Sequence, residues 1–177
     1  MADDARKRRF EQVALPHLDA AFDLARWLTR NDQDAEDVVQ EAFMRALRFI
    51  DSYRGGSGRA WTLAIVRNTC FSWLEKNRPQ WLQSGADIDS LPLPDESPLG
   101  EDPARSALRN ADRDMLVRAL EALPVVFREA IVLRELEDFS YKDMAQMLGV
   151  PIGTVMSRLA RARRMLREAL GKEAGDG

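Results

Sequence analysis

Apolar residues in the first half of the chain follow the spacing of α-helices. From Phe10 to about Arg78 they recur at steps of three and four residues, which places them along one helix face. The stripe of the first predicted helix is Val13, Leu18, Ala21, Phe22, Ala25 and Leu28. Residues 31–34 (NDQD) interrupt this pattern and offer an N-cap for a second helix, with Glu36 and Asp37 in its first turn. The predicted buried stripe of that second helix is Val38, Val39, Ala42, Phe43, Ala46, Leu47 and Ile50.

Turn-forming residues divide the rest of the chain. Three glycines within four positions make residues 52–58 (SYRGGSG) a loop, and another helix is expected from about Arg59 to Lys76. Four prolines and several acids between residues 80 and 103 leave too little apolar surface to order the chain, so we expect an extended linker there. Helical spacing resumes near Ala104, with Pro124 between two helices.

A helix-turn-helix is predicted near the end of the sequence. Ser140 is a suitable N-cap for a short helix whose buried face consists of Tyr141, Met144, Ala145 and Leu148. Gly149 provides the left-handed residue that a tight turn needs. Pro151 then occupies a tolerated position at the start of a second helix.

The second helix of this motif has the pattern of a DNA recognition helix. We expect Val155, Leu159, Ala162 and Leu166 to face inward and Ser157, Arg158, Arg161 and Arg164 to lie on the opposite side. Short polar side chains can reach base edges, and arginines can bind phosphates or guanine. A basic helix alone is more often a solvated surface. The correct spacing of helix, glycine turn and second helix favours DNA binding here.

Composition supports an all-α protein with two small helical domains. The chain has 177 residues, 45% of them apolar, and is rich in helix-forming residues. The net charge of −3 conceals an uneven distribution: residues 81–105 hold six acids and one base, and residues 154–172 hold six bases and one acid. The single cysteine, Cys70, excludes an internal disulfide, and a buried inert thiol is expected.

Features of enzymes and membrane proteins are missing from the sequence. No apolar run has the length of a membrane span, so no membrane insertion and a cytoplasmic location are expected. His17 is the only histidine, and neither a metal-ligand cluster nor a phosphate-binding loop nor a nucleophile–base pair is visible. We therefore predict no catalytic residue, no metal and no cofactor.

Several motifs resemble those of one family. The matching segments are residues 34–43 (DAEDVVQEAF), 51–55 (DSYRG), 61–68 (WTLAIVRN), 123–124 (LP), 133–137 (LRELE) and 140–145 (SYKDMA). In this order they resemble regions 2.2, 2.3, 2.4 and 4 of bacterial sigma-70 family RNA polymerase sigma factors. No region 3 lies between them, so the closest subfamily is the extracytoplasmic-function (ECF, group 4) sigma factors. The resemblance extends from about Phe10 to Leu170.

The resemblance implies a division of labour between two domains. Residues 1–79 would form the region 2 domain, residues 80–105 the acidic linker, and residues 106–177 the region 4 domain. Asp37, Gln40 and Glu41 match the positions that bind the β′ clamp helices of core RNA polymerase, and the β flap is the other expected contact. The alternative for these three residues is a solvated acidic helix face. The linker would thread through the polymerase or serve only as a solvated tether.

Promoter DNA is the second implied partner. Asn68 matches a position that holds a base flipped from the −10 element, and the loop from Ser52 to Arg59 would complete its pocket. Arg59 and Arg67 are candidate phosphate contacts, and Trp61 is a candidate −10 contact, although a core position is the simpler interpretation of Trp61 and Trp73. The predicted −35 contacts are Thr154, Ser157, Arg158 and Arg161. An anti-sigma factor is the expected regulator.

Two departures from the family pattern and two alternative functions need a test. Met156 replaces an arginine common in relatives, which predicts a different −35 preference or weaker phosphate anchoring. Ser72 replaces a common acidic residue, with no consequence that we can derive.

A stand-alone helix-turn-helix regulator would account for the second half of the chain and would bind a palindrome as a dimer. A helical enzyme is the other alternative.

Overall fold

The computed structural model describes residues 1–82 and 112–175, with side chains up to residue 172 in the last helix. Every regular element within these residues is helical, which confirms the predicted all-α class. The helices fall into two compact units, the first built on residues 1–79 and the second on most of the residues from Arg113 onward. Most of the predicted linker and the predicted helix start near Ala104 lie outside the described residues. The domain boundaries at 79 and 105 therefore stay a prediction.

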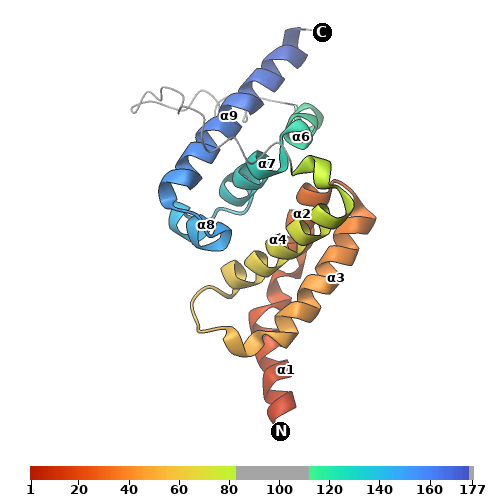
Figure 1. Cartoon of the computed structure of the whole chain (residues 1–177), viewed down its shortest axis with the longest axis vertical. Helices are drawn as coiled ribbons and strands as arrows, with labels where there is room; N and C mark the ends of the chain where they lie inside the picture. Colours follow the sequence, from red (N-terminus) through yellow and green to blue (C-terminus); the bar gives the residue numbers. More distant parts are fainter. Residues whose placement is uncertain (83–111, 176–177) are drawn as a thin grey trace. The chain divides into compact units, whose positions relative to one another are not determined.

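The first unit is a bundle of α-helices joined by short 3₁₀ turns (Figure 1). Its α-helices are α1 (Ala2–Val13), α2 (Leu18–Thr29), α3 (Asp32–Arg48) and α4 (Gly58–Asn77). The 3₁₀ turns are η1 (Leu15–His17), η2 (Ile50–Ser52) and η3 (Pro79–Trp81). Helices α2, α3 and α4 pack against one another. The large side chains buried completely between them are Leu24, Leu28, Ile50, Leu63 and Leu74.

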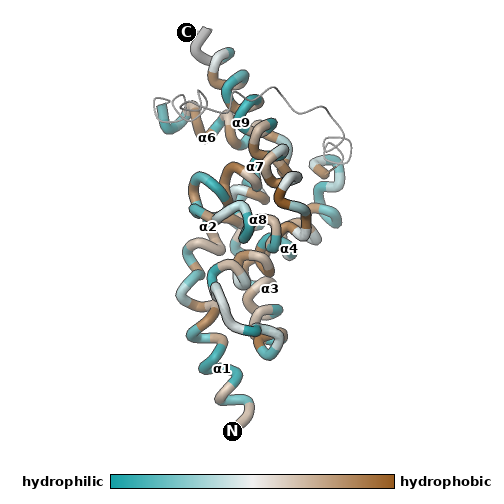
Figure 2. Tube along the Cα trace, turned by 90° about the vertical axis from the view of Figure 1, so that its left-hand side faces the viewer, coloured by the Kyte–Doolittle hydropathy of each residue, from teal (hydrophilic) through white to brown (hydrophobic). Residues whose placement is uncertain are grey.

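The first predicted helix is two helices in the structure. α1 begins at Ala2 and ends at Val13, and η1 separates it from α2. α1 is largely hydrophilic (Figure 2) and buries none of its residues, so it has no apolar stripe for the spacing to detect. Pro16 in η1 lacks a backbone donor, which prevents a continuous helix at this point.

The buried stripes were predicted with two clear errors. Six of the seven stripe positions in and just after α3 are buried, but Leu47 is 41% exposed. Leu18, the first residue of α2, is 45% exposed. Both residues stand at an end of their helix, and each lines a groove open to solvent. Burial of Cys70 is confirmed.

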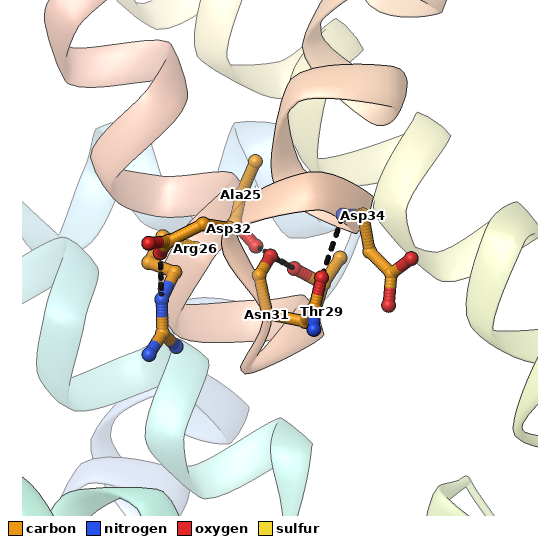
Figure 3. A network of polar contacts seen from close by, with 6 residues as sticks. All are labelled: Ala25, Arg26, Thr29, Asn31, Asp32 and Asp34. Carbon is orange, nitrogen blue, oxygen red and sulfur yellow. Dashed lines mark hydrogen bonds and ion pairs between the residues drawn. The ribbon is translucent and has the colours of Figure 1, made fainter.

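The corner between α2 and α3 fixes the direction of α3 (Figure 3). The side-chain oxygen of Asn31 accepts a hydrogen bond from the backbone N–H of Asp34 (2.9 Å), which is an N-cap of the kind that stabilises a helix by about 1 kcal/mol. The Thr29 hydroxyl donates to the carbonyl of Ala25 (2.8 Å), and Arg26 forms an ion pair with Asp32 (2.5 Å). Three local interactions thus define how the next helix begins.

The second unit consists of α6 (Arg113–Ala122), α7 (Val125–Ile131), a π-helical turn η5 (Val132–Leu136), α8 (Tyr141–Leu148) and α9 (Ile152–Gly175). α9 packs against α6 and α7. Its inward residues Val155, Leu159, Ala162 and Leu166 are all at most 1% exposed, as predicted. The apolar residues of α7 stand out in Figure 2.

A buried arginine closes the corner between α6 and α7. Arg128 is 2% exposed, and its guanidinium donates to the carbonyls of Leu123 (2.7 Å) and Glu121 (3.1 Å). These carbonyls come at the end of α6, where backbone acceptors lack helical partners. Arg128 therefore satisfies the end of one helix from within the next. None of the helices in the described parts of the chain combines the length and the apolar character needed to cross a bilayer.

Candidate functional site

One face of α3 presents the residues predicted to bind polymerase. Asp37, Gln40 and Glu41 are exposed, whereas Val38 and Ala42 on the other side are buried. Glu41 is joined to Arg45 by an ion pair of 2.8 Å. The structure thus presents the predicted set on one surface of the first unit.

A groove of about 690 Å³ lies next to Gln40, between α2 and α3. Its apolar lining is Leu18, Phe22 and Val39, and its other lining residues include the acids Asp19, Asp23 and Glu36. Burial and the nearby Asp19 raise the pKa of Asp23. The surface around Gln40 is therefore acidic with an apolar floor, a combination suited to a partner that carries basic and apolar side chains.

The loop before α4 is held by its own side chains. Ser57 caps α4 by accepting a hydrogen bond from the N–H of Ala60 (3.1 Å). The Tyr53 hydroxyl donates to the carbonyl of Gly56 (2.5 Å), and the Tyr53 ring packs edge-on against Trp61, with 5.5 Å between ring centres. Trp61 is half-buried. It is therefore neither a fully buried core residue, as the simpler interpretation of the sequence predicted, nor a fully exposed one. The same is true of Trp73.

Asn68 is exposed on α4 and is held by its neighbour. Arg67 donates a hydrogen bond to the side-chain oxygen of Asn68 (3.2 Å), and its guanidinium lies 4.0 Å from the ring centre of Phe71. The Asn68 oxygen is therefore engaged, and its amide N–H₂ group is the one able to donate. Arg59 is half-buried at the start of α4. Burial, and secondarily the charge of Arg59, lower the pKa of His17.

The helix-turn-helix has the predicted local geometry. The Ser140 hydroxyl accepts a hydrogen bond from the N–H of Asp143 (3.0 Å), and Gly149 has the positive φ of 65° required by the turn. At the start of α9, Thr154, Ser157 and Arg158 are partly exposed, and the Ser157 hydroxyl donates to the carbonyl of Thr154 (3.0 Å). These side chains share the first turns of one helix.

The predicted exposure of Arg161 is wrong. Arg161 is only 7% exposed, whereas Arg164 on the next turn is exposed and paired with Glu168 (3.3 Å). The sequence pattern suggested an outward position because arginine usually lies in solvent, but a long side chain can lie along the protein surface and be covered. Met156 is 52% exposed, next to the predicted −35 contacts.

A polar cluster that the sequence did not indicate supports α8 and α9. Glu135 in η5 forms an ion pair with Arg163 in α9 (3.0 Å), and Tyr141 also hydrogen-bonds Arg163. Arg134 donates to the carbonyl of Phe139 (2.8 Å), with its guanidinium 4.9 Å from the Tyr141 ring centre. One feature of the sequence could have indicated this cluster. Arg163 directly follows Ala162, which the helical spacing places on the inward face of α9.

Two family models match the chain, one in each unit. Sigma-70 region 2 matches residues 14–80, and Sigma-70, region 4 matches residues 113–166. The ECF RNA polymerase sigma-E factor of Escherichia coli K12 is 36% identical over 141 residues, which covers 75% of this chain and 72% of the relative. The chain belongs to the ECF RNA polymerase sigma factors. Membership excludes the enzyme alternative, because sigma factors are transcription initiation factors.

Other sigma factors resemble the chain over most of its length. The ECF RNA polymerase sigma factor SigE of Mycolicibacterium smegmatis is 33% identical over 175 residues, which is 98% of this chain but 66% of SigE, so the chain spans about two thirds of that relative. The sigma factor RpoE of Bartonella quintana, solved with the anti-sigma factor NepR, has a TM-score of 0.68 and 32% identity, with 92% of this chain and 96% of RpoE covered. CnrH, solved with the cytosolic domain of CnrY, has a TM-score of 0.59 and 26% identity, with coverage of 97% and 93%.

Proposed function

We propose that this sigma factor binds core RNA polymerase through the exposed face of α3 and directs transcription from promoters with a −10 and a −35 element. Asp37, Gln40 and Glu41 contact the β′ clamp helices. Their joint exposure on one face and the acidic groove beside Gln40 support this assignment. Charge complementarity at such a surface raises the association rate and selects the partner.

The −10 element is recognised by the loop before α4 and by α4 itself. Asn68 donates from its amide to a base flipped out of the duplex, and Trp61 and Tyr53 provide apolar surface beside the loop. Arg59 and Arg67 contact phosphates. The position of Asn68 on the exposed side of α4, with its oxygen already bound by Arg67, supports a donor role.

The −35 element is recognised by the start of α9. Thr154, Ser157 and Arg158 face the major groove, where short hydroxyl side chains and a guanidinium can contact base edges and phosphates. Arg161 joins them only after its side chain leaves its covered position. Contact of the second unit with the β flap completes the binding to polymerase.

The two units act together because one chain carries both. Weak contacts by each unit reinforce one another through effective concentration, provided that residues 80–105 act as the linker between domains 1–79 and 106–177. Regulation by an anti-sigma factor is supported by the likeness to RpoE, which was solved with the anti-sigma factor NepR. The protein acts in the cytoplasm, where bacterial RNA polymerase transcribes.

Runoff transcription tests this function. Core polymerase, with and without the protein, is supplied with a promoter library, and transcripts that require the protein should come from sequences that share two spaced motifs. The observation that carries the proposal is the presence of both sigma regions on one chain. If no transcript depends on the protein and it binds a palindromic duplex tightly as a dimer, the stand-alone regulator is correct instead.

A matched pair of variants tests the polymerase contact. Asp37→Ala should weaken binding to core polymerase about tenfold, because a charged contact at an interface is lost. Gln33→Ala changes another exposed residue of α3, one turn earlier, and should leave binding unchanged. Equal binding of the two variants in a fluorescence titration would place the polymerase contact elsewhere.

A further inference from the structure

Helix α1 precedes the part of the chain that the region 2 family model matches, which begins at residue 14. It buries none of its own residues, so the usual reason for a helix to pack on a domain, burial of an apolar face, is weak here. The Phe10 ring does pack edge-on against Phe43 of α3, with 6.1 Å between ring centres. The polar contacts of α1 are made by arginines, which reach the end of α3 and the loop before α4.

Arg9 holds the start of this loop through Tyr53. Its guanidinium donates to the carbonyl of Tyr53 (2.5 Å) and lies 5.6 Å from the centre of the Tyr53 ring. Tyr53 in turn bonds the carbonyl of Gly56 and packs against Trp61. A continuous series of contacts therefore leads from α1 through the loop to α4.

The two ends of the loop are also attached to α1. Before the loop, Arg6 forms an ion pair with Asp51 (2.9 Å) and donates to the carbonyl of Arg48 (3.1 Å). After the loop, a Cβ atom on Gly58 would lie 2.9 Å from the carbonyl oxygen of Val13, so α4 begins in direct contact with the end of α1. α1 thus contacts the chain just before the loop, Tyr53 near the start of the loop and Gly58 at its end.

We propose that α1 is a brace that holds the loop before α4 (residues 52–58, named the −10 loop below) in its DNA-binding conformation, and that Arg9 is the positioning residue of this brace. This inference rests on the proposed −10 recognition by the loop and Asn68. A loop that is ordered before DNA arrives does not lose conformational entropy when it captures a base, so capture competes better with restacking. Arg9 acts through Tyr53 and does not itself contact DNA.

Open-complex formation on a duplex promoter, followed by permanganate reactivity of unpaired thymines, tests the brace. Arg9→Ala should slow open-complex formation about tenfold, since a charge-assisted hydrogen bond that orders the loop is removed. The matched control is Arg8→Ala, which removes the same charge from the neighbouring position, where the side chain bonds only its own helix at the carbonyl of Asp4 (3.3 Å). Arg8→Ala should remain within about twofold of the unchanged protein, the tolerance expected of an exposed local contact.

A template that is already unpaired across the −10 element separates loop ordering from general damage. Strand opening no longer depends on capture there, so the Arg9→Ala defect should shrink to about twofold, while core binding and the thermal midpoint stay unchanged. Tyr53→Phe keeps the ring beside Trp61 but loses the bond to Gly56, and it should give an intermediate defect on the duplex. Arg9→Lys retains one donor and should recover part of the rate.

Three results would overturn the brace. Equal defects for Arg8→Ala and Arg9→Ala would indicate a general charge effect. Equal Arg9→Ala defects on duplex and unpaired templates would indicate a structural fault. A salt dependence of promoter binding that falls by about one phosphate contact in Arg9→Ala would indicate direct DNA contact instead. If the unchanged protein itself supports no promoter-dependent transcription, the proposed function fails, and the brace with it.

Discussion

The carboxylate of Glu135 lies 3.0 Å from the guanidinium of Arg163, with the two side chains 19% and 15% exposed. Glu135 belongs to the π-helical turn η5 and Arg163 to the middle of α9, so the pair joins two elements that are distant in sequence. Burial alone would lower the pKa of Arg163, but hydrogen bonds to Glu135 and Tyr141 outweigh it and raise that pKa. The pair therefore anchors the long helix α9, which carries the proposed −35 contacts.

Glu135→Ala should destabilise the second unit by about 2–4 kcal/mol, because it leaves a largely buried guanidinium without its carboxylate. Glu168→Ala breaks the exposed Arg164–Glu168 pair on the same helix and should change stability by less than about 0.5 kcal/mol. Urea denaturation followed by circular dichroism measures both. Similar midpoints for the two variants would show that Glu135 contributes no more than a surface ion pair.

Asn68→Ala should impair open-complex formation more than polymerase or duplex binding. The loss of one directed donor in the pocket for the flipped base corresponds to about 1–3 kcal/mol, or roughly tenfold to a hundredfold in the amount of open complex. Asn77→Ala is the control, because Asn77 is the other asparagine of α4 and its side chain donates to the carbonyl of Trp73 in its own helix. An identical decrease for both variants, or an Asn68→Ala defect in core binding, would remove Asn68 from the pocket.

Met156→Arg should strengthen binding to the −35 duplex. Met156 is exposed beside Ser157 and Arg158, so an arginine there can reach the DNA backbone. Each added phosphate contact makes the slope of log affinity against log salt steeper by about 0.9. An equal gain on a shuffled −35 sequence would assign the new side chain to phosphate anchoring, whereas a gain confined to one −35 sequence would assign it to base preference. An unchanged slope on both would contradict the placement of Met156 against DNA.

Stability of the first unit should fall as the pH decreases below about 6.5, in part through His17. The pKa of His17 is lowered by burial and by Arg59, so below its ordinary value of 6.5 the unfolded chain takes up a proton that the folded chain refuses. The loss of stability continues until the folded pKa is reached. Denaturation of the protein and of His17→Gln at pH 7.5 and 5.5 measures this contribution. The variant should lose less stability over that interval, and an equal loss would exclude His17 as a source.

The helices that carry a continuous apolar stripe were predictable from the sequence. α3 and α9 each bury a stripe spaced by three and four residues, and the caps at Asn31 and Ser140 come from side chains whose preference for that position is strong. The same is true of the turn at Gly149, where a positive φ strongly favours glycine. In these segments local preference and tertiary packing agree.

The remaining features depend on contacts that spacing does not reveal. α1 is held by arginines and by the edge-on contact of Phe10 with Phe43, not by a buried apolar stripe, so its separate existence went unpredicted. The π-helical turn arises where Glu137 bonds the carbonyl of Val132 (2.9 Å), five residues back, and no residue type announces such a turn. Arg128 and Arg161 are buried against the general tendency of arginine, because their surroundings, and not their own chemistry, decide their exposure.

The glycines of the loop before α4 will differ in which substitutions they tolerate. Gly55 and Gly56 have φ values of 94° and 84°, with open space where a side chain would start, so the obstacle there is torsional and residues that adopt positive φ, such as asparagine, will be the mildest replacements. At Gly58 the obstacle is a backbone oxygen 2.9 Å away, and even alanine meets it. In a library of substitutions, tolerance at Gly55 and Gly56 should therefore follow the preference of each amino acid for positive φ. Tolerance at Gly58 should instead follow side-chain volume, because there the chain lies against the end of α1.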